Sequence, residues 1–303
     1  MLYGIVDVGS NTIRLGVYDC EGPAFRVLLA KKETAGLAGY ARKGNLSAQG
    51  IDRCIQVLRA YQAAVEPFRL DGFFVFATAS LRNVRNTDEA VRRIWEETGL
   101  RVDVIPGRDE AVLDFAGAVY GTGMESGLMV DIGGGSIELA AFSHGRLEQA
   151  VSVDTGSLKL YTRHVKELLP AKAERRAIRE EVAEKLAALR EFQGRRFSQI
   201  CGVGGTIRGC CRLYNVRGEL PEDNARFPAG AVKALLRPYK EPEKEACDLL
   251  IRVLPDRVHT QLPGMLAFQT ILETYGAEQV IVSSCGVREG YLLERVLRAF
   301  QEK

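Results

Sequence analysis

Two glycine-rich stretches of this chain repeat one pattern: Asp7-Val8-Gly9-Ser10-Asn11-Thr12 and Asp131-Ile132-Gly133-Gly134-Gly135-Ser136. Each follows a short apolar run and precedes a run of β-prone residues, which predicts a strand, a tight turn and a second strand. A repeat of this kind indicates two related lobes. The expected strands are 2–6 and 13–18 in the first copy, and 128–130 and 137–142 in the second.

Turns of this composition are suited to binding phosphate. Glycine lets backbone N–H groups approach an anion without an intervening side chain, and successive N–H groups form a concave anion site. Ser10, Thr12 and Ser136 add hydroxyl donors. Because a carboxylate would repel phosphate, Asp7 and Asp131 favour a divalent cation between them, and we predict Mg²⁺ or another divalent cation. A single Asp-x-Gly turn would indicate an ordinary hairpin, but two copies in matching contexts favour phosphate binding.

Length and composition indicate a folded chain of two domains. The 303 residues exceed the usual size of a single core, and we expect lobes over 1–123 and 124–303, with the terminal helix a candidate to pack back on the first lobe. The hydrophobic content of 46% and charged content of 26% are typical of globular proteins. The net charge of +2 is too small to indicate generic binding to nucleic acid or membrane, and we expect neither as a partner.

The cysteines and the N-terminus indicate a reducing compartment. The seven cysteines form no Cys-x-x-Cys pair, and their odd number does not resemble a disulfide framework. The N-terminus lacks a basic region and reaches Asp7 too early for a signal peptide. The apolar run over 72–81 is too short to span a membrane. We therefore expect a cytoplasmic protein with reduced thiols.

Two further segments follow predicted strands, where α/β folds gather their sites. In Ala77–Arg82 the Arg82 guanidinium is suited to bidentate phosphate binding, the alternative being a surface arginine near a helix start. In Pro106–Ala111 a turn opens a helix and places Glu110 in its first turn. A carboxylate there can orient and deprotonate water that attacks phosphorus, or it can simply stabilise the helix dipole.

Two glycine-containing turns in the second half of the sequence are further candidate sites. Gly202–Thr206 reads as a strand-to-helix turn, able to receive another phosphate or the sugar of a nucleotide. In Ser283–Gly290, Cys285 invites a nucleophile hypothesis, but none of the three histidines lies in a recognisable motif. A packed thiol is the favoured interpretation of Cys285.

With these motifs assembled, the chain resembles the exopolyphosphatase and guanosine pentaphosphate phosphohydrolase (Ppx/GppA) family, within the superfamily of sugar kinases, heat-shock ATPases and actin. The resemblance implies two ribonuclease-H-like lobes, each an α/β domain with a mixed five-stranded sheet flanked by helices, and an active site in the interdomain cleft. It rests on Asp7–Thr12 with Arg14, 77–82 with Asn86, 107–111, 131–139, 204–206 and 284–290.

The resemblance also implies roles for individual residues. The substrate would be a linear phosphoanhydride whose terminal phosphate is hydrolysed with Mg²⁺, and Glu110 falls on the family's general base. Asp131 and Glu138 fall on its metal-associated carboxylates, to which we add Asp7. The predicted phosphate-binding residues are Gly9, Ser10, Asn11, Thr12, Arg82, Gly133, Gly134, Gly135, Ser136, Gly204, Gly205 and Thr206.

The leading hypothesis is an exopolyphosphatase, expected as a homodimer, that releases orthophosphate from the ends of inorganic polyphosphate. The alternatives are removal of the 5′-phosphate from guanosine pentaphosphate or another nucleoside polyphosphate, and a non-catalytic sensor that binds polyphosphate or an alarmone. A sugar kinase is disfavoured, because the resemblance makes Glu110 a water-activating carboxylate. Pro106 and Ala35 depart from the family pattern, which usually has serine and arginine there, and leave the preferred chain length open.

Overall fold

The computed structural model describes residues 1–239 and 244–298, and the chain divides into two compact units. Unit 1 comprises Met1–Leu113 together with the segment that begins at Arg288, and unit 2 comprises Asp114–Val287. Each unit contains a mixed β-sheet flanked by helices, which confirms the predicted α/β class. The division falls inside helix α4 (Gly107–Thr122), whose first turns belong to unit 1.

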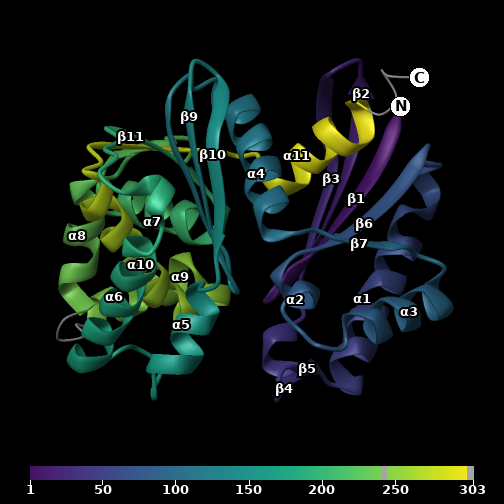
Figure 1. Ribbon diagram of the computed structural model, residues 1–303, viewed down its shortest axis with the longest axis horizontal. Helices are drawn as coiled ribbons and strands as arrows, with labels where there is room; N and C mark the ends of the chain where they lie inside the picture. Colours follow the sequence, from purple (N-terminus) through teal and green to yellow (C-terminus); the bar gives the residue numbers. More distant parts are fainter. Residues whose placement is uncertain (240–243, 299–303) are drawn as a thin grey trace. The chain divides into compact units, whose positions relative to one another are not determined.

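The sheet of unit 1 has the strand order β3-β2-β1-β6-β7. β1 is antiparallel to β2 and parallel to β6, and the β1–β2 pairing ends with Val8 opposite Ile13. The predicted strand, turn and strand around the first glycine stretch are therefore confirmed (Figure 1). The strands are β1 (Leu2–Val8), β2 (Thr12–Glu21), β3 (Ala24–Thr34), β6 (Gly72–Ala77) and β7 (Val102–Val104), with a separate small hairpin of β4 (Ala41–Arg42) and β5 (Asn45–Leu46).

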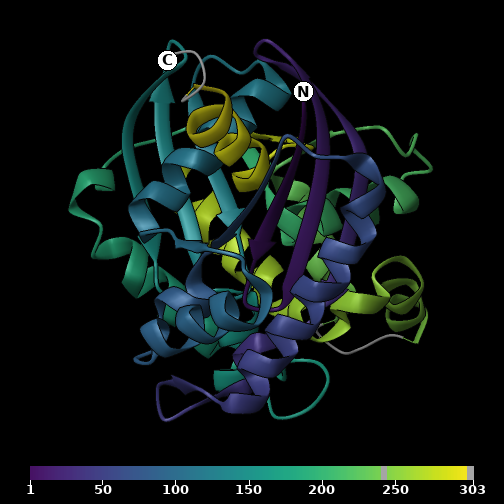
Figure 2. The same cartoon turned by 90° about the vertical axis from the view of Figure 1, so that its right-hand side faces the viewer.

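The helices of unit 1 flank this sheet. α1 begins after Ser47, whose hydroxyl caps the helix by accepting a hydrogen bond from the Gly50 N–H at 3.3 Å. Figure 2 shows α1 lying along the purple strands β1 to β3. α11 packs on the sheet through Tyr291, whose ring stacks on Phe76 with the centroids 4.8 Å apart. The helices are α1 (Ala48–Val65), α2 (Ala79–Arg82), α3 (Thr87–Thr98) and α11 (Val287–Tyr291), which continues as a π-helix over Leu292–Leu297.

The sheet of unit 2 has the order β10-β9-β8-β11-β13-β12, one strand more than expected. The additional strand is Arg226–Pro228, which pairs antiparallel with β13 and forms the edge of the sheet. The polar segment before it contains Gly218 and Pro221 and has no regular secondary structure between α7 and this strand. The strands are β8 (Gly127–Ile132), β9 (Ile137–Ser143), β10 (Arg146–Val153), β11 (Gln199–Val203), β12 (Arg226–Pro228) and β13 (Gln279–Val282).

The helices of unit 2 include one amphipathic and one almost wholly buried helix. α6 buries Ile178, Val182 and Leu186, whose spacing of four residues places them on one face of the helix. α10 is buried along most of its length and contributes Leu266, Phe268 and other residues to the core of unit 2. No helix within residues 1–239 and 244–298 is both long and apolar enough to cross a membrane. The helices are α5 (Ser157–His164), α6 (Lys172–Ala187), α7 (Gly204–Arg217), α8 (Gly230–Leu236), α9 (Lys244–Val253) and α10 (Val258–Tyr275).

Candidate active site

The first glycine turn joins β1 to β2 in unit 1. The Gly9 N–H donates to the Thr12 carbonyl at 3.1 Å, and a Cβ at Gly9 would lie 2.9 Å from that oxygen, so glycine is required there. The carbonyls of Ser10 and Asn11 accept hydrogen bonds from the backbone of 36–38. The turn is thus held by the Gly9 N–H and by the carbonyls of Ser10 and Asn11, so the predicted anion site would use N–H groups other than that of Gly9. Asp7 is buried at the end of β1, beside this turn.

Arg82 and Glu110, also in unit 1, contact each other. The Arg82 Nη1 donates to the Glu110 Oε2 at 2.6 Å and to the Ile105 carbonyl at 3.0 Å. α2 places Arg82 just beyond β6, and Glu110 lies in the first turn of α4, where its N–H donates to the Pro106 carbonyl. The side chains are 18% and 9% exposed. The predicted phosphate ligand and the predicted general base therefore form one ion pair.

A charged network that the motifs did not predict neighbours Asp7. The Arg288 Nη2 donates to the Glu289 Oε1 at 3.1 Å, and the Tyr18 hydroxyl donates to the same oxygen at 2.5 Å. Burial opposes the charge on Arg288, but Glu289, Tyr18 and Asp7 outweigh that effect and raise the pKa of Arg288. Arg288 therefore stays cationic and compensates the charge of Asp7, whether or not Asp7 also binds a metal ion.

The second glycine turn joins β8 to β9 in unit 2. The Gly133 N–H donates to the Ser136 carbonyl at 3.0 Å, the same closure as in the first turn. The Gly134 carbonyl accepts hydrogen bonds from the first residues of α5, including Leu158 at 3.0 Å. A Cβ at Gly156 would lie 2.6 Å from the backbone of Gly134 and Ser136. The start of α5 thus packs tightly on this turn and fixes its conformation.

The third glycine turn, Gly202–Thr206, lies against Asp131 in unit 2. A Cβ at Gly204 would lie 1.9 Å from the Asp131 Oδ1, and Gly204 has a φ of +79°. The Thr206 hydroxyl donates to the Ile132 carbonyl at 3.1 Å and is completely buried. Gly204 therefore lies directly against the Asp131 carboxylate. Thr206, a predicted phosphate ligand, holds the turn to β8 through its hydroxyl.

Asp114 is a candidate metal ligand that the sequence analysis missed. Its carboxylate lies within 4.8 Å of the carboxylate of Glu138, and the two residues are 0% and 1% exposed. The Ser152 hydroxyl donates to the Glu138 Oε1 at 2.7 Å. Two buried carboxylates this close repel each other unless a cation or a proton compensates them, and carboxylate oxygens are what Mg²⁺ prefers. The pair therefore fits a divalent cation.

Arg257 is a second residue that the motifs did not indicate. A Cβ at Gly205 would lie 1.9 Å from the Arg257 Nη2, so the guanidinium lies directly against the backbone of the third turn. Burial and the charge of Arg257 lower the pKa of His259. His259 is therefore neutral near neutral pH, and Arg257 supplies the positive charge beside Gly205.

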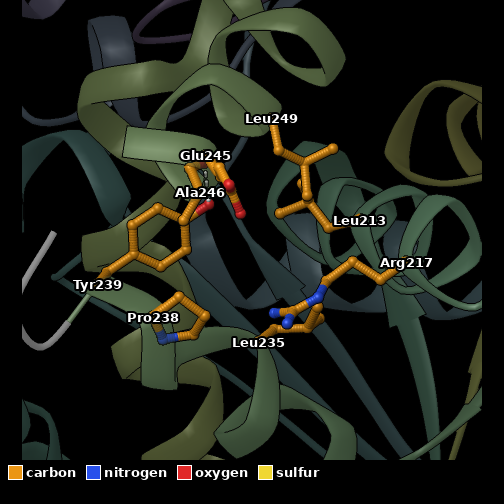
Figure 3. A pocket seen from close by; sticks show the side chains of 8 residues that line it. All are labelled: Leu213, Arg217, Leu235, Pro238, Tyr239, Glu245, Ala246 and Leu249. Carbon is orange, nitrogen blue, oxygen red and sulfur yellow. Dashed lines mark hydrogen bonds between the residues drawn. The ribbon is translucent and has the colours of Figure 1, made fainter. Parts of the chain in front are cut away.

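A cavity of about 180 Å³ lies elsewhere in unit 2, among α7, α8 and α9 (Figure 3). Its lining mixes polar and apolar surface, with Arg217 and Glu245 as the charged side chains. Burial raises the pKa of Tyr239 to about 12, and its hydroxyl donates to the Ala246 carbonyl at 2.9 Å. Among the described residues, this lining includes none of the predicted site residues.

Two α/β units, each with a β-hairpin closed by a glycine turn, define a two-unit protein of the ribonuclease-H-like class. The model of the Ppx/GppA phosphatase family matches residues 17–299. The chain therefore belongs to the Ppx/GppA phosphatase family, which confirms the resemblance.

Two relatives match nearly the whole chain. An uncharacterised protein of Streptomyces coelicolor is 28% identical, over 98% of this chain and 90% of its own length. Exopolyphosphatase 1 of Mycobacterium bovis is 24% identical, over 98% of this chain and 88% of its own length.

Solved structures confirm the fold. The Ppx/GppA family member of Aquifex aeolicus has a TM-score of 0.82 at 25% identity, covering 99% of this chain and 98% of that one. An exopolyphosphatase of Cytophaga hutchinsonii has a TM-score of 0.87 at 20% identity, with the same coverage, and shows the fold alone.

Proposed function

We propose that the protein is an Mg²⁺-dependent exopolyphosphatase that releases orthophosphate from the end of inorganic polyphosphate. The observation that carries this proposal is the buried Arg82–Glu110 pair, because it joins a cation suited to a terminal phosphate to a carboxylate suited to activate water. The name of the Mycobacterium bovis relative supports polyphosphate as the substrate.

In the proposed reaction Glu110 accepts a proton from water as the water oxygen attacks the terminal phosphorus. The P–O bond to the bridging oxygen breaks, and the products are orthophosphate and a chain shortened by one phosphate. A divalent cation held by Asp131, Asp114 and Glu138 would neutralise phosphate oxygens. The N–H groups of the glycine turns would orient the phosphates.

Substitution of the general base tests this mechanism. We expect Glu110→Gln to lower kcat for polyphosphate by about 10²- to 10⁴-fold, because the amide cannot accept the proton. Orthophosphate release and polyphosphate binding are measured on the same preparation. Asp109→Asn is the matched control, because Asp109 is exposed and pairs with Arg295, and it should keep the wild-type rate. Full activity of Glu110→Gln would exclude Glu110 as the base.

Two other functions remain as alternatives. Guanosine pentaphosphate is a second candidate substrate, supported by the Arg257 guanidinium against the third turn, where an additional anionic group would find a cation. A sensor from another class would bind polyphosphate without releasing orthophosphate. Wild-type protein that binds polyphosphate with Mg²⁺ but hydrolyses neither compound would favour the sensor.

A further inference from the structure

Arg82 carries two roles that compete with each other. In this structure its guanidinium is bonded to Glu110, yet the proposed function requires it to bind the terminal phosphate. A carboxylate that accepts a strong charge-assisted hydrogen bond is a poor base, because the guanidinium stabilises its charged form. Glu110 is therefore restrained by the residue that the substrate needs.

We propose that Arg82 exchanges partners: the terminal phosphate takes the guanidinium from Glu110, and its arrival thereby releases the general base. This inference rests on the proposed function and deepens it by making Arg82 a positioning residue for Glu110 as well as a phosphate ligand. The carboxylate then becomes available for water only when a phosphate is in place.

The surroundings of the pair suit such an exchange. The Arg82 Nη1 also donates to the Ile105 carbonyl at 3.0 Å, a bond that can hold the guanidinium in place while its anionic partner changes. The side chains are 18% and 9% exposed, so their charges are weakly screened by solvent. A phosphate offers several oxygens in a geometry that matches the guanidinium fork, and it carries more charge than one carboxylate.

The exchange predicts an unusual effect on binding. Because Glu110 competes with phosphate for Arg82, Glu110→Gln should bind orthophosphate more tightly than the wild type, by roughly five- to tenfold. Removing any negative charge near an anion site has some such effect, so the gain must be shown to depend on Arg82. In the Arg82→Gln background, Glu110→Gln should therefore change orthophosphate affinity by less than about twofold.

The experiment is a double-mutant cycle measured by titration calorimetry with orthophosphate as the probe. The four proteins are the wild type, Glu110→Gln, Arg82→Gln and the double variant, and Asp109→Asn is the control for a nearby exposed charge. Thermal unfolding of each protein confirms that it is folded. A gain in affinity that is lost without Arg82 supports the exchange, because a purely structural ion pair would predict weaker binding when it is broken.

Two results would overturn the exchange: equal orthophosphate affinity of Glu110→Gln and the wild type, or the same gain with and without Arg82. Since binding of orthophosphate needs no turnover, the result does not depend on whether the protein hydrolyses polyphosphate. Failure of the exchange and failure of the proposed function are therefore separate outcomes.

Discussion

Gly204 shows how single residues shape the candidate site. Its φ of +79° lies in the region that favours glycine, and a Cβ would come within 1.9 Å of the Asp131 Oδ1. Both the backbone conformation and the space exclude a side chain. The carboxylate of Asp131 therefore occupies a position that only glycine at 204 allows.

Two glycine substitutions distinguish the effect of the positive φ at Gly204 from the effect of the missing space for a Cβ. We expect Gly204→Ala to lose most Mg²⁺-dependent phosphatase activity, because the methyl group must displace the Asp131 carboxylate. Gly145→Ala is the matched control: its φ is +70°, but a Cβ there would meet nothing within 4 Å. The control should lose about 1–2 kcal/mol of stability from backbone strain and keep its activity. Equal rates for the two variants would contradict the assigned role of Gly204.

The candidate site residues predicted from the sequence belong to local motifs. The glycine turns, Arg82 and Glu110 each lie in a short segment with turn, strand-end or helix-start signals. Asp114 and Arg257 were missed, because each is a single charged residue whose relevant neighbour is distant in the sequence. Arg288 lies in the quoted segment 284–290, but nothing local indicated that it lies near Asp7. One local signal was available for Asp114: it follows Glu110 by four residues on a helix, a spacing that places two side chains on one face.

Glu181 links helix α6 to helix α5 through hydrogen bonds. Its carboxylate accepts hydrogen bonds from His164 at 2.6 Å, from Thr155 at 3.0 Å and from Arg163. Burial alone would raise its pKa, but these hydrogen bonds outweigh burial and lower the pKa of Glu181. A carboxyl group whose pKa is lowered in the folded state adds stability above its unfolded pKa and loses it in acid.

This linkage predicts a pH-dependent stability difference. Near pH 7, Glu181→Gln should melt about 2–4 °C below the wild type, and the difference should shrink towards zero near pH 3, where Glu181 is protonated. Thermal unfolding across this pH range provides the measurement. The neighbouring Glu180→Gln is the control, because Glu180 forms only an exposed i,i+4 pair with Arg176. A difference in melting temperature that stays constant with pH would show that the carboxylate charge is not its source.

Helices and strands whose apolar residues recur at a regular spacing could be predicted from the sequence, and those without such a spacing could not. The two glycine hairpins and amphipathic α6 follow from alternation and from helical spacing. α10 is buried on nearly all sides, so its sequence shows no polar face from which to identify a helix. β12 is three residues long and ends in Pro228, and its pairing with β13 is a tertiary contact that local sequence cannot reveal.

Both units of the molecule contain predicted site residues. Unit 1 supplies the first glycine turn, Arg82 and Glu110, and unit 2 supplies the second turn and the carboxylates. The family match across 17–299 begins after the first glycine turn and includes Arg82, Glu110 and the residues of unit 2. The proposed function makes the chain a phosphoanhydride hydrolase rather than a binding protein or a kinase.

Isotope labelling of the released orthophosphate tests whether the chain is a phosphoanhydride hydrolase. The wild type is incubated with polyphosphate, guanosine pentaphosphate or ATP in ¹⁸O-water, with Mg²⁺ or with a chelator, and the orthophosphate is analysed by mass spectrometry. We expect Mg²⁺-dependent release from polyphosphate, with one solvent oxygen in each released orthophosphate, because water is the nucleophile. Binding of polyphosphate without any labelled orthophosphate, from this or either other compound, would contradict this expectation.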